Sequence, residues 1–78
     1  MNSLIKRADR LQRAGAAYTV WRVRELLGPR RYKTAIHTAW MSGDYEGNGL
    51  GELAGPLQTV RNLYGPSWLH RLRLPAQS

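Results

Sequence analysis

Apolar residues recur along this chain at the spacing of amphipathic helices, and the clearest run covers residues 29–41. There the apolar side chains return at i, i+3, i+4, i+7 and i+8, in the order Tyr32, Ala35, Ile36, Ala39 and Trp40. Because a helix turns once in about 3.6 residues, these side chains share one side. The spacing therefore predicts a helix from about Pro29 to Met41, with this side in the core.

Two shorter helices are predicted before it, over residues 3–14 and 17–27. Their apolar sides consist of Leu4, Ala8 and Leu11 in the first, and of Val20, Val23 and Leu27 in the second. We expect the helix to break at Gly15, because glycine is among the least favourable residues in a helix interior. We expect Gly28 to end the second helix as a left-handed C-cap residue. A core this small needs the leucines of the first helix as well.

After the third helix, glycine and proline divide the chain again. Residues 42–51 form a glycine-rich acidic loop, which serves as a flexible connector or as an acidic lobe that contacts a basic protein surface. Residues 56–64 form another helix, starting near Pro56 and ending at Tyr64. Its apolar side consists of Leu57, Val60 and either Leu63 or Tyr64.

Two alternatives stay open for the end of the chain. Ser67 can cap a last helical turn that reaches Leu72. The alternation from His70 to Leu74 also fits a short strand.

The predicted fold class is all-α, a small bundle of four to five short helices, with that strand as its one alternative element. Seventy-eight residues allow one domain, here residues 1–78. The chain has no cysteine, which excludes disulfides and thiolate zinc sites.

Charge is separated along the chain. Twelve Lys and Arg against five Asp and Glu give a net charge of +7 and a sequence pI near 10.9. Residues 1–33 carry a net +7, residues 34–60 a net −3 and residues 61–78 a net +3. This positive balance favours an anionic partner, and DNA or RNA is the usual one.

Two groups of cations are the candidate nucleic-acid-binding residues. They are Lys6, Arg10 and Arg13 on the first helix, and Arg30, Arg31 and Lys33 at the start of the third. The first group recurs at i, i+4 and i+7 and forms a basic side. The second opposes the helix dipole, and a docked phosphate reverses that unfavourable interaction because helix N-termini and arginine both bind phosphate. A solvated charged surface is the alternative interpretation of both groups.

Residues 19–34, TVWRVRELLGPRRYKT, form a helix, a glycine turn and a second helix with a basic start. This segment resembles the helix-turn-helix of DNA-binding domains, in which a helix of the V-x-E-L-L-G type precedes the recognition helix. The resemblance implies a small basic module that binds nucleic acid and regulates transcription. An ordinary αα-hairpin within a small bundle is the alternative.

A protein partner is the other function that the sequence allows. Trp21 lies off the apolar side of its helix, and Asp44, Tyr45 and Glu46 lie in the acidic loop, so these four are candidate interface residues. As a compact, arginine-rich, tryptophan-bearing module, the chain is similar in type to the factors with which phages modulate a host machine, such as RNA polymerase or a CRISPR complex.

Several function classes have little support in the sequence. His37 and His70 are far apart, with no cysteine and with no carboxylate at helical spacing from His37, so we expect neither an enzyme nor a metal site. The loop from Asp44 resembles the first half of a calcium-binding EF-hand, but Gly55 stands where the closing Glu is required. We also expect no cofactor, no small-molecule substrate, no membrane insertion and a cytoplasmic (or, in a eukaryote, nuclear) location.

Overall fold

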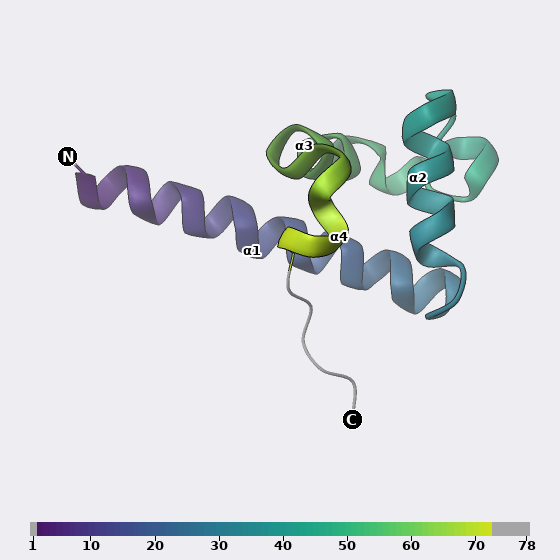
Figure 1. Cartoon of the computed structure of the whole chain (residues 1–78), viewed down its shortest axis with the longest axis horizontal. Coiled ribbons are helices and arrows are strands. Elements are labelled where there is room, and N and C mark those ends of the chain that lie inside the picture. The colour runs from purple at the N-terminus through teal and green to yellow at the C-terminus, as the bar shows by residue number, and fades with distance from the viewer. Residues whose placement is uncertain (1, 73–78) are drawn as a thin grey trace.

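The computed structural model describes residues 2–72, with side chains from residue 4 onward, and every regular element in this range is helical. The elements are α1 (Asn2–Leu27), α2 (Tyr32–Ser42), η1 (Glu46–Asn48), η2 (Gly51–Leu53), α3 (Ala54–Tyr64), η3 (Gly65–Ser67) and α4 (Trp68–Arg71), where η denotes a 3-10 turn. The prediction of an all-α fold is confirmed for this range (Figure 1). The number of helices differs, because three helices and a four-residue turn replace the expected four to five short helices.

The first two predicted helices are a single helix of 26 residues, so the predicted break at Gly15 is wrong. Glycine inside a helix costs only about 1 kcal/mol relative to alanine, which is too little to end a helix whose neighbours favour it. Ala14, Ala16 and Ala17 surround Gly15, and alanine is the best helix former. The Thr19 hydroxyl also donates to the Gly15 carbonyl oxygen at 2.9 Å.

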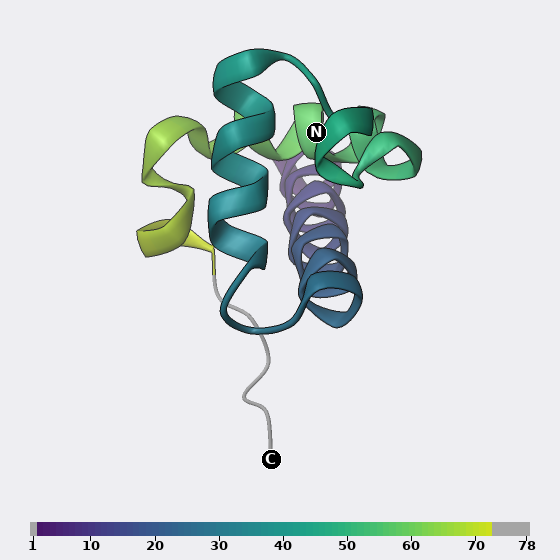
Figure 2. The same cartoon turned by 90° about the vertical axis from the view of Figure 1, so that its right-hand side faces the viewer.

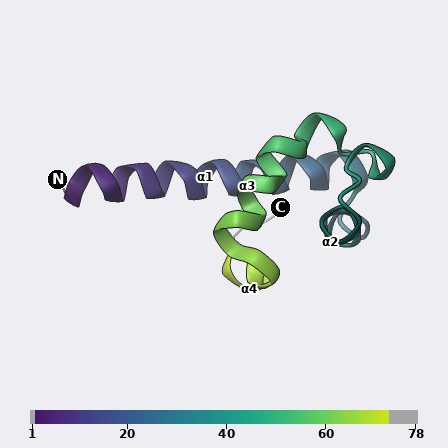
Figure 3. The same ribbon diagram turned by 90° about the horizontal axis from the view of Figure 1, so that it is seen from above.

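Joining the two helices fixes the phase between their apolar sides. Leu11 and Val20 are nine residues apart, about two and a half turns, so they lie on opposite sides of α1. The side with Val20 and Val23 faces the other helices, and both residues are fully buried. Leu4 and Leu11 are 68% and 67% exposed, which corrects the expectation that these leucines belong to the core. The first half of α1 extends beyond the rest of the domain (Figures 1 and 3).

Gly28 ends α1 as the sequence predicts. Its φ is +90°, in the left-handed region, and its N–H donates to the Arg24 carbonyl oxygen at 2.8 Å. Residues 29–31 form a turn, so α2 begins at Tyr32, three residues later than predicted. Figure 2 shows α2 beside the last turns of α1.

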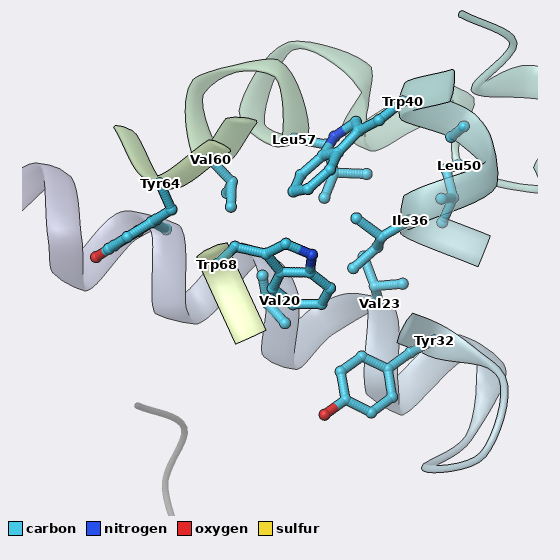
Figure 4. Close-up of a cluster of buried hydrophobic side chains, with 12 residues drawn as sticks. Val20, Val23, Tyr32, Ile36, Trp40, Leu50, Leu57, Val60, Tyr64 and Trp68 are labelled. Carbon is cyan, nitrogen blue, oxygen red and sulfur yellow. The ribbon is translucent and has the colours of Figure 1, made fainter. Parts of the chain in front are cut away.

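The predicted apolar sides of α2 and α3 form the core together with α1 and α4 (Figure 4). Ala35 is only partly buried, and Tyr64 rather than Leu63 completes the buried side of α3. The buried apolar residues are Ala16, Val20, Val23, Tyr32, Ile36, Ala39, Trp40, Leu50, Leu57, Val60, Tyr64 and Trp68.

The segment between α2 and α3 is more structured than the loop that the sequence predicts. It contains η1 and η2, and it inserts Leu50 into the core with 1% of its surface exposed. The Leu50 N–H donates to the Tyr45 carbonyl oxygen at 2.8 Å, which closes the turn around η1. Leu50 therefore anchors this segment to the domain.

The end of the described chain is helical. Trp68 to Arg71 form α4, and Ser67 precedes it at the capping position, without a side-chain capping hydrogen bond. The alternative of a strand from His70 is wrong for His70 to Leu72, whereas positions 73–74 lie outside the described residues.

Gly15→Ala should raise the free energy of unfolding by about 0.5–1 kcal/mol, measured by urea denaturation. A Cβ built at Gly15 meets no heavy atom within 4 Å, and Gly15 is not among the glycines with positive φ. Alanine is therefore accommodated without strain and restricts the unfolded chain. Gly43→Ala is the matched control, because its φ of +75° makes the same substitution unfavourable. A loss of stability in Gly15→Ala would contradict a continuous α1.

Candidate nucleic-acid interface

The predicted cations of α1 lie on its exposed first half. Lys6, Arg10 and Arg13 are all exposed and share one side of the helix, as their spacing predicts. Arg13 Nε donates to an Asp9 carboxylate oxygen at 2.9 Å, one turn earlier. This hydrogen bond and the charge of Asp9 raise the pKa of Arg13 above its ordinary value.

The second predicted group lies at the other end of α1. Arg30 is in the turn, Arg31 is at the capping position of α2 and Lys33 is in its first turn. All three are exposed. From Arg13 to Leu27 the helix rises about 21 Å, so the two groups lie far apart along the axis of α1.

Arg30 and Arg31 line an open hollow of about 580 Å³ between α2 and η1. Thr34 and Thr38 of α2 and Asn48 of η1 contribute polar side chains to its walls. The hollow combines two guanidinium groups with hydroxyl and amide groups, which is a lining suited to an anion.

Two buried tyrosines each hold two cations over their rings. The guanidinium carbons of Arg13 and Arg71 lie 5.5 and 6.0 Å from the ring centroid of Tyr64. Arg24 and Lys33 lie 5.8 and 5.7 Å from that of Tyr32. Each ring therefore brings together cations from distant parts of the sequence, since an aromatic face attracts positive charge.

Trp68 connects these two clusters. Its ring packs edge-on against Tyr32 with centroids 6.5 Å apart, and against Trp40 at 5.5 Å. Figure 4 shows Trp68 between Tyr64 and Tyr32, on the side of the core that α4 covers. Arg71 follows on the same short helix, so the packing of Trp68 sets where Arg71 lies.

These contacts define a surface that we call the basic face, made of Lys6, Arg13, Arg24, Lys33 and Arg71. Lys6, Arg13 and Arg24 belong to it together because intervals of 7 and 11 residues are close to two and three helical turns. Sequence reasoning missed Arg24 and Arg71. The 11-residue interval was a usable signal for Arg24, once α1 is continuous. No sequence signal predicts that Arg71 lies on this face. The packing of Trp68 on the core positions α4 and therefore Arg71.

The acidic segment lies across α1 from the basic face. Glu46 and Glu52 line an open hollow beside Leu26. Leu26 and Arg24 are two residues apart on α1, so they project to opposite sides. In Figure 2 the segment with η1 and η2 lies on one side of α2 and α4 on the other. The cations of the basic face are thus separated in space from Glu46 and Glu52, whereas Arg30 and Arg31 line a hollow with residues of the acidic segment.

The candidate protein-interface residues have different local roles. The Asp44 carboxylate accepts a hydrogen bond from the Gly47 N–H at 2.8 Å, and the Tyr45 hydroxyl donates to Gln58 Oε1 at 3.0 Å. Both side chains therefore hold the segment between α2 and α3 in place, whereas Glu46 is exposed. Trp21 is half-buried and stacks on Tyr18, with centroids 6.1 Å apart. Its role as an interface residue stays a prediction.

His37 and His70 are both exposed, and no group of three potential metal ligands occurs within residues 2–72. Over the same range, no helix combines the length and apolar character that crossing a membrane requires. In comparisons with known proteins, the chain matches no family model, no curated protein and no solved structure.

Proposed function

We propose that this domain binds nucleic acid through the basic face. The observation that carries the proposal is the gathering of Arg13, Arg24, Lys33 and Arg71 over two tyrosine rings, on the side of α1 opposite Glu46 and Glu52. Asp9 pairs with Arg13, and the cations of this surface outnumber it. A surface with an excess of one sign attracts a polyanion and orients it.

The arrangement suits a sugar-phosphate backbone. From Lys6 to Arg24 the cations of α1 cover about 27 Å of the helix axis. Duplex DNA carries one negative charge per about 1.7 Å of its axis, so a surface of this length meets several phosphates at once. The Tyr64 and Tyr32 rings restrict the side chains above them, which lowers the entropy that these cations lose on binding.

Base reading is assigned, within the same proposal, to the start of α2. Arg30, Arg31 and Lys33 precede and open a helix that follows α1 through the Gly28 turn, as in a helix-turn-helix. Lys33 lies on the basic face, whereas Arg30 and Arg31 line the hollow beside η1, so base reading requires the nucleic acid to extend around the start of α2. This role would make the domain a sequence-selective regulator of transcription. Binding of the basic face alone is independent of sequence.

The test measures binding to random duplex DNA, and to single-stranded RNA, over a series of salt concentrations. Lys33→Gln combined with Arg71→Gln should weaken binding and reduce the slope of log K against log salt by about 1.8 on duplex DNA, or about 0.9 for each lost phosphate contact. Both side chains are exposed, so the fold is retained.

Arg22→Gln is the control, because Arg22 is exposed on the other side of α1, where it contacts Tyr18. It removes one charge of the same kind and should leave the slope unchanged. Equal losses for each charge removed in the two variants would mean that net charge rather than the basic face determines binding. No retention of either nucleic acid at low salt would overturn the proposal and leave the protein-partner interpretation of the sequence.

A further inference from the structure

One side of α1 is exposed along most of the helix. We call it the outer stripe; it consists of Leu4, Ala8, Leu11, Gly15 and Tyr18. The three large residues of the stripe, Leu4, Leu11 and Tyr18, are 68%, 67% and 58% exposed. Val20 and Val23 face the core from the other side of the same helix, so the described part of the domain leaves this stripe uncovered.

The outer stripe has the spacing of a coiled-coil seam. Its large residues recur every seven positions, and the small residues Ala8 and Gly15 recur every seven positions between them. Alternating steps of four and three residues keep a seam straight toward a partner helix. This spacing has no use in the described domain, because none of the five side chains contributes to the core.

We propose that the outer stripe is the interface of a symmetric dimer, in which α1 of a second copy packs against it in the antiparallel direction. This orientation puts a large residue opposite a small one in the central layers, with Leu11 against Gly15 of the second copy and Tyr18 against Ala8 of the second copy. A Cβ built at Gly15 meets nothing within 4 Å, so space for the approaching leucine exists. A parallel pair would instead place large residues on large residues and Arg22 on Arg22.

Charge favours the same orientation. Arg7 lies on the flank of the outer stripe, whereas Lys6 and Arg13 belong to the basic face. Glu46 and Glu52 lie beside Leu26 at the other end of α1. Antiparallel packing directs the half of each copy that carries Arg7 toward the acidic end of the other, and the two-fold symmetry repeats this arrangement.

The half-buried Trp21 gains a role in this arrangement. Trp21 and Arg7 lie on the same flank of the outer stripe, two heptads apart along α1. When Leu11 faces Gly15 of the second copy, Arg7 comes beside Trp21 of the second copy. A guanidinium over an indole ring is a favourable contact at the edge of an interface. The outer stripe and the basic face lie on different sides of α1, so the dimer does not depend on the proposed function.

The oligomeric state of the full chain tests the proposal, by sedimentation equilibrium from micromolar concentration to about 1 mM. We expect a mass approaching twice the 8.9 kDa of the chain. Leu11→Glu should weaken the dimer by more than about tenfold, because it buries a charge at the seam. Met41→Glu is the matched control, since Met41 is 76% exposed on α2, away from the stripe. Gly15→Gln is a second variant and should also weaken the dimer, because its side chain fills the space that Leu11 of the second copy requires.

A single chain mass throughout this range, or a dimer that Leu11→Glu leaves intact, would overturn the proposal. Cysteine cross-linking tests the orientation, because the natural chain has no cysteine. Leu4→Cys mixed with Arg22→Cys should form a disulfide between copies, whereas Leu4→Cys alone should not. Efficient cross-linking of Leu4→Cys with itself would establish a parallel pair and contradict the antiparallel interface.

Discussion

Trp68→Ala should lower the free energy of unfolding by about 3–5 kcal/mol, the cost typical of removing a buried tryptophan. Trp68 is 3% exposed and packs edge-on against both Tyr32 and Trp40. No other side chain of α4 is buried, so the substitution removes the contact that holds this helix on the domain. Urea denaturation followed by far-UV circular dichroism measures the loss.

Leu69→Ala is the matched control for this prediction. Leu69 is the next residue on α4 and is 46% exposed, so its truncation should change stability by no more than about 0.5 kcal/mol. Similar losses of unfolding free energy in the two variants would mean that α4 does not pack on the core through the side that carries Trp68. The same pair also tests how Arg71 is positioned, because only Trp68→Ala should weaken nucleic-acid binding as well.

The elements that the sequence predicted best are those whose apolar spacing has a single interpretation. In α2, Tyr32, Ile36, Ala39 and Trp40 occupy one side of the helix and are all buried. Helix α2 has no second apolar side, so the periodicity alone shows which side faces the core. Trp40 was assigned to the core for this reason, and that prediction is confirmed.

The first third of the chain shows where periodicity failed. Two apolar sides, one with Leu11 and one with Val20, each predict a buried face when their segments are read separately. Their phases conflict only in a continuous helix, in which one of the two has to be exposed. Glycine lowers helix stability without requiring a break, so Gly15 could not decide between the two arrangements.

The candidate site was predicted in part. Exposed cations were found because they are visible in the composition of each segment, and Lys6, Arg13 and Lys33 do belong to the basic face. The pairing of these cations through Tyr64 and Tyr32 depends on tertiary packing between α1, α3 and α4. Contacts of this kind have no periodic signal in the sequence.

Leu50 is the clearest case of a core residue that local sequence conceals. It stands between Gly49 and Gly51 in a glycine-rich acidic segment, where neither helical nor strand spacing marks it as buried. The structure buries it nevertheless, because Gly49 adopts a φ of +76° and turns the chain back toward the core. Leu50 thus fixes, together with Tyr45, the position of a segment that contains Asp44, Glu46 and Glu52.

Leu50→Ala should therefore destabilise the domain by about 2–5 kcal/mol, because it removes a fully buried side chain and leaves a cavity in the core. Met41→Ala is the control, since Met41 is 76% exposed and its truncation should cost no more than about 0.5 kcal/mol. Both are measured by chemical denaturation. A destabilisation by Leu50→Ala as small as that of the control would mean that the segment between α2 and α3 only connects the two helices and does not pack on the core. In that case Glu46 and Glu52 would have no fixed place beside Leu26, and the charge argument for the antiparallel dimer would lose its acidic half.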